Sequence, residues 1–465
     1  MNTSLPLSRR GFLQQTGMGM GGLTLATMLG DAFAIESPLT PRQPHFPAKA
    51  KHVIHIFAAG GPSQVDTWDP KPELTRNEGK VIPGHDGVAF ASPFTFRKTG
   101  ASGIEVSEIF PRLGEHIDEM AIIRSMWTDI PDHGIASRFM HTGSLQLPKP
   151  SLGSWVLYGL GNANQNMPGF ISLGGQPEWR QASFLPGIYQ GANVNYSPTM
   201  KLEDVLLNIR SQFTPLDQQQ KQINLANQLN AIHSERLHKD GQLEARIESF
   251  EMAFRMQTEA TDAFDISKES AETRALYSNT KAAEPGVRGN SKPDVLGMKL
   301  LVARRLVERG VRFVQVVHGS WDHHNDLAAN LRQRAAELDA PAAGLLADLK
   351  QRGLLDETLV VWGGEMGRTV VRDRNGTGGT TGGRDHNGHA MCSWMAGGGV
   401  KPGTVHGATD EFGARATTDR VHIHDWHATI LALLGFDHER LTYRYNGRDF
   451  RLTDNFGNVV KAIIA

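Results

Sequence analysis

Helix-like and strand-like stretches alternate through the last third of the chain. Residues 294–309 repeat apolar side chains at helical spacing, and residues 312–318 form a β-rich apolar run. Residues 327–352 predict a second helix, with a break near Pro341, and residues 358–362 predict a second buried strand. Helices and strands that alternate with short links are typical of the α/β class, so we expect a mostly parallel central sheet flanked by helices.

The rest of the chain adds further strands and one long helical segment. Short apolar runs predict strands at 52–59, 120–124, 170–173 and 390–396. Residues 427–434 predict a closing helix. From about 216 to 270 the composition shifts to Gln, Glu, Leu, Ala and Met, with apolar residues at helical spacing. This segment predicts a helical insertion packed on the main domain.

The carboxyl ends of the predicted strands carry side chains that suit a metal ion. Asp322 and His324 follow one strand, Glu365 follows the next, and His386 precedes the last strand. Sites in parallel sheets lie beyond the carboxyl ends of the strands, so we expect these four residues to converge. Imidazoles mixed with carboxylates suit a divalent metal, zinc or calcium, which would polarise a water or a phosphoryl or sulfuryl oxygen.

Two arginines lie close to these residues in the sequence. We expect Arg368 and Arg384 to bind the anionic group of a substrate through paired N–H bonds. The glycine-rich segment 376–383 between them lacks the lysine of a phosphate-binding loop and has no dinucleotide fingerprint. It therefore favours a mobile lid or a disordered loop over a nucleotide site.

Composition narrows the class of function. The 465 residues carry a net charge of −1, and a nucleic-acid binder needs an excess of Lys and Arg, so nucleic acid is not an expected partner. The chain has a single cysteine, Cys392, so no disulfide framework can form within it. Cys392 lies in an apolar run.

The amino terminus predicts export. Arg9-Arg10 stands in a twin-arginine pattern, a mild apolar stretch follows, and Ala32-Phe33-Ala34 offers small residues for cleavage. We expect a signal peptide at 1–34, handled by the twin-arginine translocase. Residues 35–465 would then form a single exported or periplasmic domain. No later segment is apolar for long enough to span a membrane, so we expect no span after cleavage.

Several motifs resemble those of the bacterial family called domain of unknown function 1501, abundant in planctomycetes, which is similar to the alkaline phosphatase and sulfatase superfamily. The motifs cover nearly the whole of the expected mature chain. They are Gly60-Gly61-Pro62-Ser63-Gln64-Val65-Asp66-Thr67, His141-Thr142-Gly143, Ser151-Leu152-Gly153-Ser154-Trp155, Trp321-Asp322-His323-His324, Gly364-Glu365-Met366-Gly367-Arg368-Thr369, Gly383-Arg384-Asp385-His386 and Tyr445-Asn446-Gly447-Arg448-Asp449-Phe450. The resemblance implies an alkaline-phosphatase-like fold.

The resemblance also implies site roles, and it shows where this chain departs from the superfamily. The metal-binding Asp after the first strand is missing, and Asp66 is a displaced candidate. The position of the superfamily's nucleophile falls on His133, which is neither Ser, Thr nor Cys. The Asp-His pair after a later strand becomes Glu365-Met366, while His386 fits the last metal-binding histidine.

These residues and motifs are compatible with two functions. One is an exported metal-dependent hydrolase of phosphate or sulfate esters, with small molecules or glycans as substrates. In it His133 serves as base or nucleophile, or a metal-bound water attacks directly. The other is a catalytically degenerate relative that binds sulfated glycans or a protein partner. The loss of the nucleophile favours the second, and the retained cluster of acids and imidazoles favours the first.

Overall fold

The computed structural model describes residues 38–146, 149–196, 262–278, 295–373 and 382–465, together with residues 218, 221 and 225. The expected signal peptide at 1–34, most of the expected helical insertion at 216–270 and most of the glycine-rich segment 376–383 lie outside the described residues. Among the described residues, no helix is both long enough and apolar enough to cross a membrane.

A nine-stranded sheet forms the centre of the described chain. Eight strands run in the order β12-β4-β11-β8-β1-β7-β5-β6, and β15 pairs with the end of β4. The strands are β1 (His52–Ala58), β4 (Met120–Trp127), β5 (Phe170–Leu173), β6 (Ala192–Asn193), β7 (Phe313–His318), β8 (Thr358–Gly363), β11 (Met391–Ala396), β12 (Thr404–His406) and β15 (Val421–His422). Four two-stranded sheets pair β2 (Phe96–Thr99) with β3 (Ile104–Ser107), β9 (Gly367–Arg368) with β10 (His386–Asn387), β13 (Ala408–Thr409) with β14 (Ala416–Thr418), and β16 (Tyr443–Tyr445) with β17 (Arg448–Phe450).

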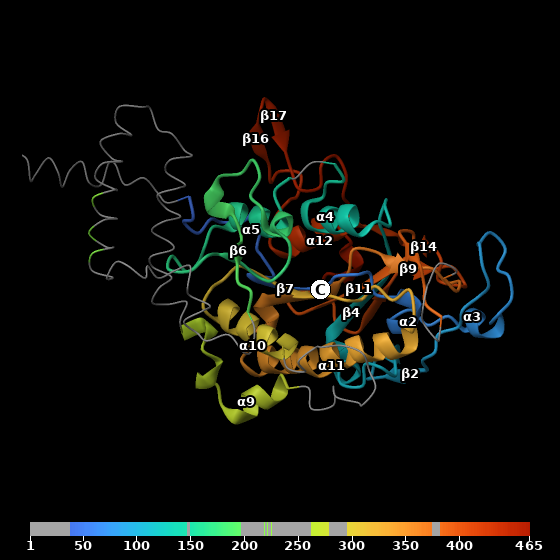
Figure 1. Cartoon of the computed structure of the whole chain (residues 1–465). Coiled ribbons are helices and arrows are strands. Elements are labelled where there is room, and N and C mark those ends of the chain that lie inside the picture. The colour runs from blue at the N-terminus through green and yellow to red at the C-terminus, as the bar shows by residue number, and fades with distance from the viewer. Residues whose placement is uncertain are drawn as a thin grey trace, which may run out of the picture.

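Helices cover both faces of this sheet. The α-helices are α2 (Gln64–Thr67), α3 (Pro72–Arg76), α4 (His133–Thr142), α5 (Leu152–Leu160), α9 (Ala271–Leu276), α10 (Val295–Glu308), α11 (Leu327–Gln351) and α12 (Ile423–Leu433). Short 3-10 turns span Leu113–Glu119, Pro177–Arg180, Gly187–Tyr189, Ile266–Lys268, Leu355–Glu357 and Lys461–Ile463. Figure 1 shows α4, α5 and α12 on one side of the sheet and α9, α10 and α11 on the other. This is the expected α/β architecture in three layers.

The strands around β1 are parallel, as the alternation of helices and strands predicts. β1 pairs in parallel with β7 and β8, and β5 pairs in parallel with β7 and β6. β11 is the exception, since it runs antiparallel to both β8 and β4. The chain leaves β8 and enters β11 at the same edge of the sheet, because no crossover helix separates the two strands. That edge therefore receives both Glu365 and His386.

Two helices differ from the expectation. The expected break in α11 is absent, and the helix continues through Pro341. Leu338, Ala342 and Leu345, on both sides of the proline, are fully buried, so their packing compensates for the backbone hydrogen bond that proline cannot make. The closing helix begins at Ile423 and not at 427, because His422 and Asp425 cap its first turn reciprocally.

The one cysteine lies inside the sheet. Cys392 on β11 is 3% exposed, and burial raises the pKa of its thiol well above the ordinary value.

Candidate metal centre

The turn after β1 brings two strand ends together. Gly60 and Gly61 have φ of +114° and +68°, and a Cβ on Gly60 would lie 2.7 Å from the backbone nitrogens of Trp321 and Asp322. Only glycine allows this backbone path and this close approach. The N–H of Gly60 donates to both carboxylate oxygens of Glu365, at 2.9 and 3.2 Å. The segments that follow β1, β7 and β8 therefore meet at one edge.

Three imidazoles surround one carboxylate oxygen at this edge. The Oδ1 atom of Asp322 lies 3.3 Å from Nε2 of His133, 2.9 Å from Nε2 of His324 and 3.4 Å from Nε2 of His386. The contact between His133 and Asp322 is an ion pair, and the Nε2 atom of His133 is itself buried. The Asp322 side chain is 42% exposed, which leaves the cluster open to solvent.

The other nitrogen of each ring is held by a protein oxygen. Nδ1 of His133 lies 2.7 Å from Oε1 of the buried Glu365, and Nδ1 of His386 lies 3.1 Å from the carbonyl oxygen of Pro131. Nδ1 of His324 lies 2.6 Å from Oδ2 of Asp373. Histidines that bind metals are commonly oriented in this way, with one ring nitrogen bonded to an oxygen and the other directed at the ion.

The charges of the cluster reinforce one another. Its contacts with Asp322 and Glu365 raise the pKa of His133 to about 9. Partial burial alone would raise the pKa of Asp322, but contacts with His133, His386 and Arg368 outweigh it and hold that pKa far below the usual value. Without a metal, His133 is therefore an imidazolium and Asp322 a carboxylate at neutral pH.

Arg368 supports the cluster from the protein interior. Its side chain is 1% exposed, and its Nη2 donates to Oδ1 of Asp322 and to the carbonyl oxygen of Gly60. Nε donates to the carbonyl oxygen of Gly61 at 2.9 Å, and Nη1 donates to that of Arg384 at 3.2 Å. The sequence predicts that Arg368 binds an anion, but its guanidinium is already hydrogen-bonded to protein oxygens. We therefore propose that Arg368 positions Asp322.

Asp66 and Arg384 pair with each other and not with the cluster. Both side chains are 0% exposed, and Nε and Nη2 of Arg384 donate to the two carboxylate oxygens of Asp66 at 2.7 and 3.0 Å. Arg384 also donates to the carbonyl oxygens of Phe90 and Thr369, at 2.9 and 3.2 Å. The Oδ2 atom of Asp66 also accepts a hydrogen bond from the Ser63 hydroxyl, so both oxygens of Asp66 are engaged. We therefore propose that this pair is structural, in place of the expected metal ligand and anion contact.

The donor set that remains fits a divalent cation. Two groups hold their ligand atoms within 4.8 Å of one another, His133 with Asp322 and His386, and His324 with Asp385 and His386. The residues of the first group are all predicted from the sequence as site residues. Asp385 in the second group is not, although it directly precedes His386. Nor is Asp373, which orients His324 and stands beside the glycine-rich segment with no motif to mark it.

The fold and this site define a mixed α/β protein with a histidine–aspartate cluster at the carboxyl edge of its sheet. The family described as "Protein of unknown function (DUF1501)" matches residues 50–464, and the chain belongs to that family. The resemblance stated from the motifs is thereby confirmed. No curated protein matches the chain.

Solved structures similar to the chain include a sulfatase, a lipoteichoic acid synthase and a protein in the alkaline phosphatase superfamily. PsFucS1 sulfatase from Pseudoalteromonas sp. is 15% identical with a TM-score of 0.34, over 86% of this chain and 69% of that one. The lipoteichoic acid synthase LtaP from Listeria monocytogenes is 8% identical with a TM-score of 0.39, over 89% and 78%. A protein in the alkaline phosphatase superfamily from Vibrio parahaemolyticus is 11% identical with a TM-score of 0.35, over 86% and 70%. At these scores the chemistry must be argued from the site itself.

Proposed function

We propose that this protein is an exported, metal-dependent hydrolase of phosphate or sulfate esters. One observation carries the proposal, namely that three imidazoles direct Nε2 at one oxygen of Asp322 while protein oxygens hold their Nδ1 atoms. A cluster built only for stability has no need of three rings oriented toward a half-exposed carboxylate.

His133, Asp322 and His386 are the proposed primary ligands, and His324 with Asp385 supports a second group that shares His386. A bound divalent cation would supply Lewis acidity toward an ester oxygen and toward a water. Nitrogen donors favour zinc, whereas a calcium site would need more oxygen ligands than these.

The chain's own residues prepare the cluster for this role. Glu365 accepts the Nδ1 proton of His133 and the N–H of Gly60, which fixes the ring without exposing the carboxylate. Arg368 holds the Asp322 carboxylate in place through its Nη2 atom. His133 stands where the superfamily resemblance places the nucleophile. Because we assign His133 to the metal ligands, we propose that a water, and not a side chain, attacks the ester.

The alternative function is binding without turnover. The observation in its favour is the contact between Arg368 and Asp322, since a guanidinium on this oxygen competes with a cation. A degenerate relative that keeps the cluster as an internal ion-pair network would show the same geometry.

Metal content of the purified full chain separates the two functions. We expect about one or more divalent ions per chain, and we expect His386→Ala and Asp322→Ala to remove most of that metal. His116→Ala is the matched control, because His116 precedes β4 and lies at the opposite edge of the sheet. Less than roughly 0.2 ion per chain, with no turnover of aryl sulfate or aryl phosphate after addition of zinc, calcium or manganese, would overturn the hydrolase.

A further inference from the structure

A two-residue ladder carries one arginine and one histidine of the candidate metal centre. β9 and β10 run antiparallel and place Arg368 opposite His386. One further backbone bond extends the pairing, from the N–H of Thr369 to the carbonyl oxygen of Asp385 at 2.8 Å. Two strands this short are marginally stable by themselves, so other contacts must hold Arg368 and His386 in place.

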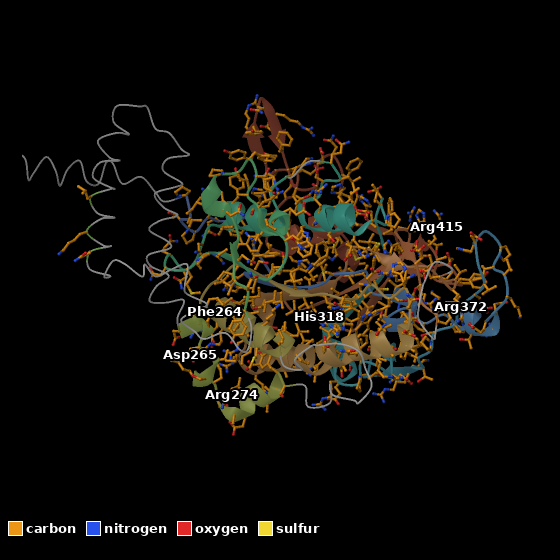
Figure 2. The ribbon with its side chains drawn as sticks, in the orientation of Figure 1. Phe264, Asp265, Arg274, His318, Arg372 and Arg415 are labelled. Atoms are coloured by element: carbon orange, nitrogen blue, oxygen red, sulfur yellow. The ribbon has the colours of Figure 1, made fainter. Side chains whose placement is uncertain are left out.

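The side chain of Gln64 supplies such contacts. Gln64 is 0% exposed and begins α2, the single turn that follows β1. Its Oε1 atom accepts the N–H of Arg368 at 2.8 Å, and its Nε2 atom donates to the carbonyl oxygens of Arg368 and Gly413, at 2.8 and 2.9 Å. Arg372 and Arg415, each a few residues beyond one of these carbonyls, lie at the same end of the molecule (Figure 2). The amide therefore binds both backbone groups of Arg368, as a third strand would.

The surroundings of this amide allow one orientation. If the amide were turned over, its nitrogen would face an N–H and its oxygen would face two carbonyls, so only the observed orientation satisfies every group. A Cβ on Gly367 would lie 2.5 Å from Oε1 of Gln64, so glycine leaves the space that the amide occupies. Asn387 adds a bond from its Nδ2 atom to the carbonyl oxygen of Ala414 at 2.9 Å and a longer one to that of Arg368 at 3.4 Å. Side-chain amides thus join the segments after β1, after β8 and before β14.

Arg368 and His386 meet again at the cluster. The Nη2 atom of Arg368 donates to Oδ1 of Asp322, and Nε2 of His386 lies 3.4 Å from the same oxygen. A displacement of β9 would therefore move both side chains relative to Asp322. We propose that Gln64 is a positioning residue of the histidine–aspartate cluster, because its amide fixes the backbone from which Arg368 extends and with which His386 pairs. The inference deepens the proposed hydrolase and rests on it for the bound metal.

The zinc affinity of the full chain tests this role. Gln64→Met keeps the approximate size of the side chain and removes all three hydrogen bonds. The dissociation constant for zinc should rise roughly 10- to 100-fold, the usual effect of losing a group that orients a metal site. The visible absorption of bound cobalt should change as well, because it reports the coordination geometry. Gln64→Glu keeps the acceptor for the Arg368 N–H but loses both donations, and it should show the same two changes if Gln64→Met does not fold.

The matched control is Asn162→Leu. Asn162 is another 0% exposed amide, and its Nδ2 atom donates to the carbonyl oxygen of Met167, in the loop after α5. This control should lower stability but change the zinc dissociation constant less than about threefold, with an unchanged cobalt spectrum. Equal losses of zinc affinity in Gln64→Met and Asn162→Leu, or an unchanged affinity and cobalt spectrum in both Gln64 variants, would overturn the proposal.

Hydrogen exchange separates this proposal from the hydrolase. If the native chain binds no metal, the hydrolase fails, but the positioning role still predicts faster exchange of the Arg368 amide in Gln64→Met. Measured against the amides of β1, the exchange rate should rise roughly tenfold or more, because the amide has lost its acceptor. Asn162→Leu should leave this ratio unchanged. An Arg368 amide that exchanges at the native rate in Gln64→Met would refute the positioning role, whatever the metal content.

Discussion

Removal of the Asp66 carboxylate is the sharpest test of the assignments within the site. In Asp66→Ala the Arg384 guanidinium keeps its charge, loses two hydrogen bonds of 2.7 and 3.0 Å, and stays 0% exposed. Breaking a buried pair by removing one partner typically costs about 3–5 kcal/mol of the free energy of unfolding, because the remaining charge is uncompensated. The double variant Asp66→Leu/Arg384→Met should recover most of that loss, since it buries no charge.

Urea denaturation followed by tryptophan fluorescence measures this change, with metal content determined on the folded fraction. The control is Lys51→Ala, which breaks the surface pair with Glu357, whose side chains are 54% and 48% exposed. That variant should lose less than about 1 kcal/mol. If Asp66→Ala loses metal from the folded fraction while its stability falls by less than about 1 kcal/mol, Asp66 is a ligand after all and the structural assignment is refuted.

Two further predictions concern the buried histidines His141 and His427 and the glycine Gly383, which lies against His324. Burial lowers the pKa of His141 to about 4 and, as the largest of several causes, that of His427 to about 3. The unfolded rings protonate near 6.5, so stability should fall as pH drops from about 6.5 toward 4, by about 1.4 kcal/mol per pH unit for each ring. His427→Gln should flatten that slope in acid titrations of thermal stability, and an unchanged slope would contradict the assignment. Gly383→Ala would place a Cβ 2.0 Å from the backbone carbon of His324, so metal content and about 1–3 kcal/mol of stability should be lost. In the matched variant Gly187→Ala the new Cβ meets nothing within 4 Å, and equal losses in both variants would show that the close contact is irrelevant.

The sequence predicts the fold and the edge of the sheet where the site lies more firmly than it predicts which residues are metal ligands. Alternating helices and strands predict a parallel sheet, and that topology alone directs Asp322, His324 and Glu365 to one edge. The antiparallel direction of β11 carries no marker in its residue pattern, because a buried strand has the same apolar composition in either direction.

Asp66 shows why ligand roles are harder to predict. Asp66 follows β1 much as Asp322 follows β7, so both satisfy the rule that sites lie beyond the ends of strands. What separates them is α2, a single buried turn that directs Asp66 inward to Arg384. A pairing between residues 318 positions apart leaves no local pattern. The contact between Asp373 and His324, 49 positions apart, is also too distant in the sequence to be marked by a motif.

The buried thiol of Cys392 has a practical consequence. A neutral thiol enclosed in a sheet is a poor nucleophile, so the folded chain should neither form mixed disulfides nor couple to maleimides. A cysteine placed at an exposed position such as Arg415 would then be the single reactive thiol in the molecule. Distances from that position to the cluster could be followed by spectroscopic labels on otherwise native protein.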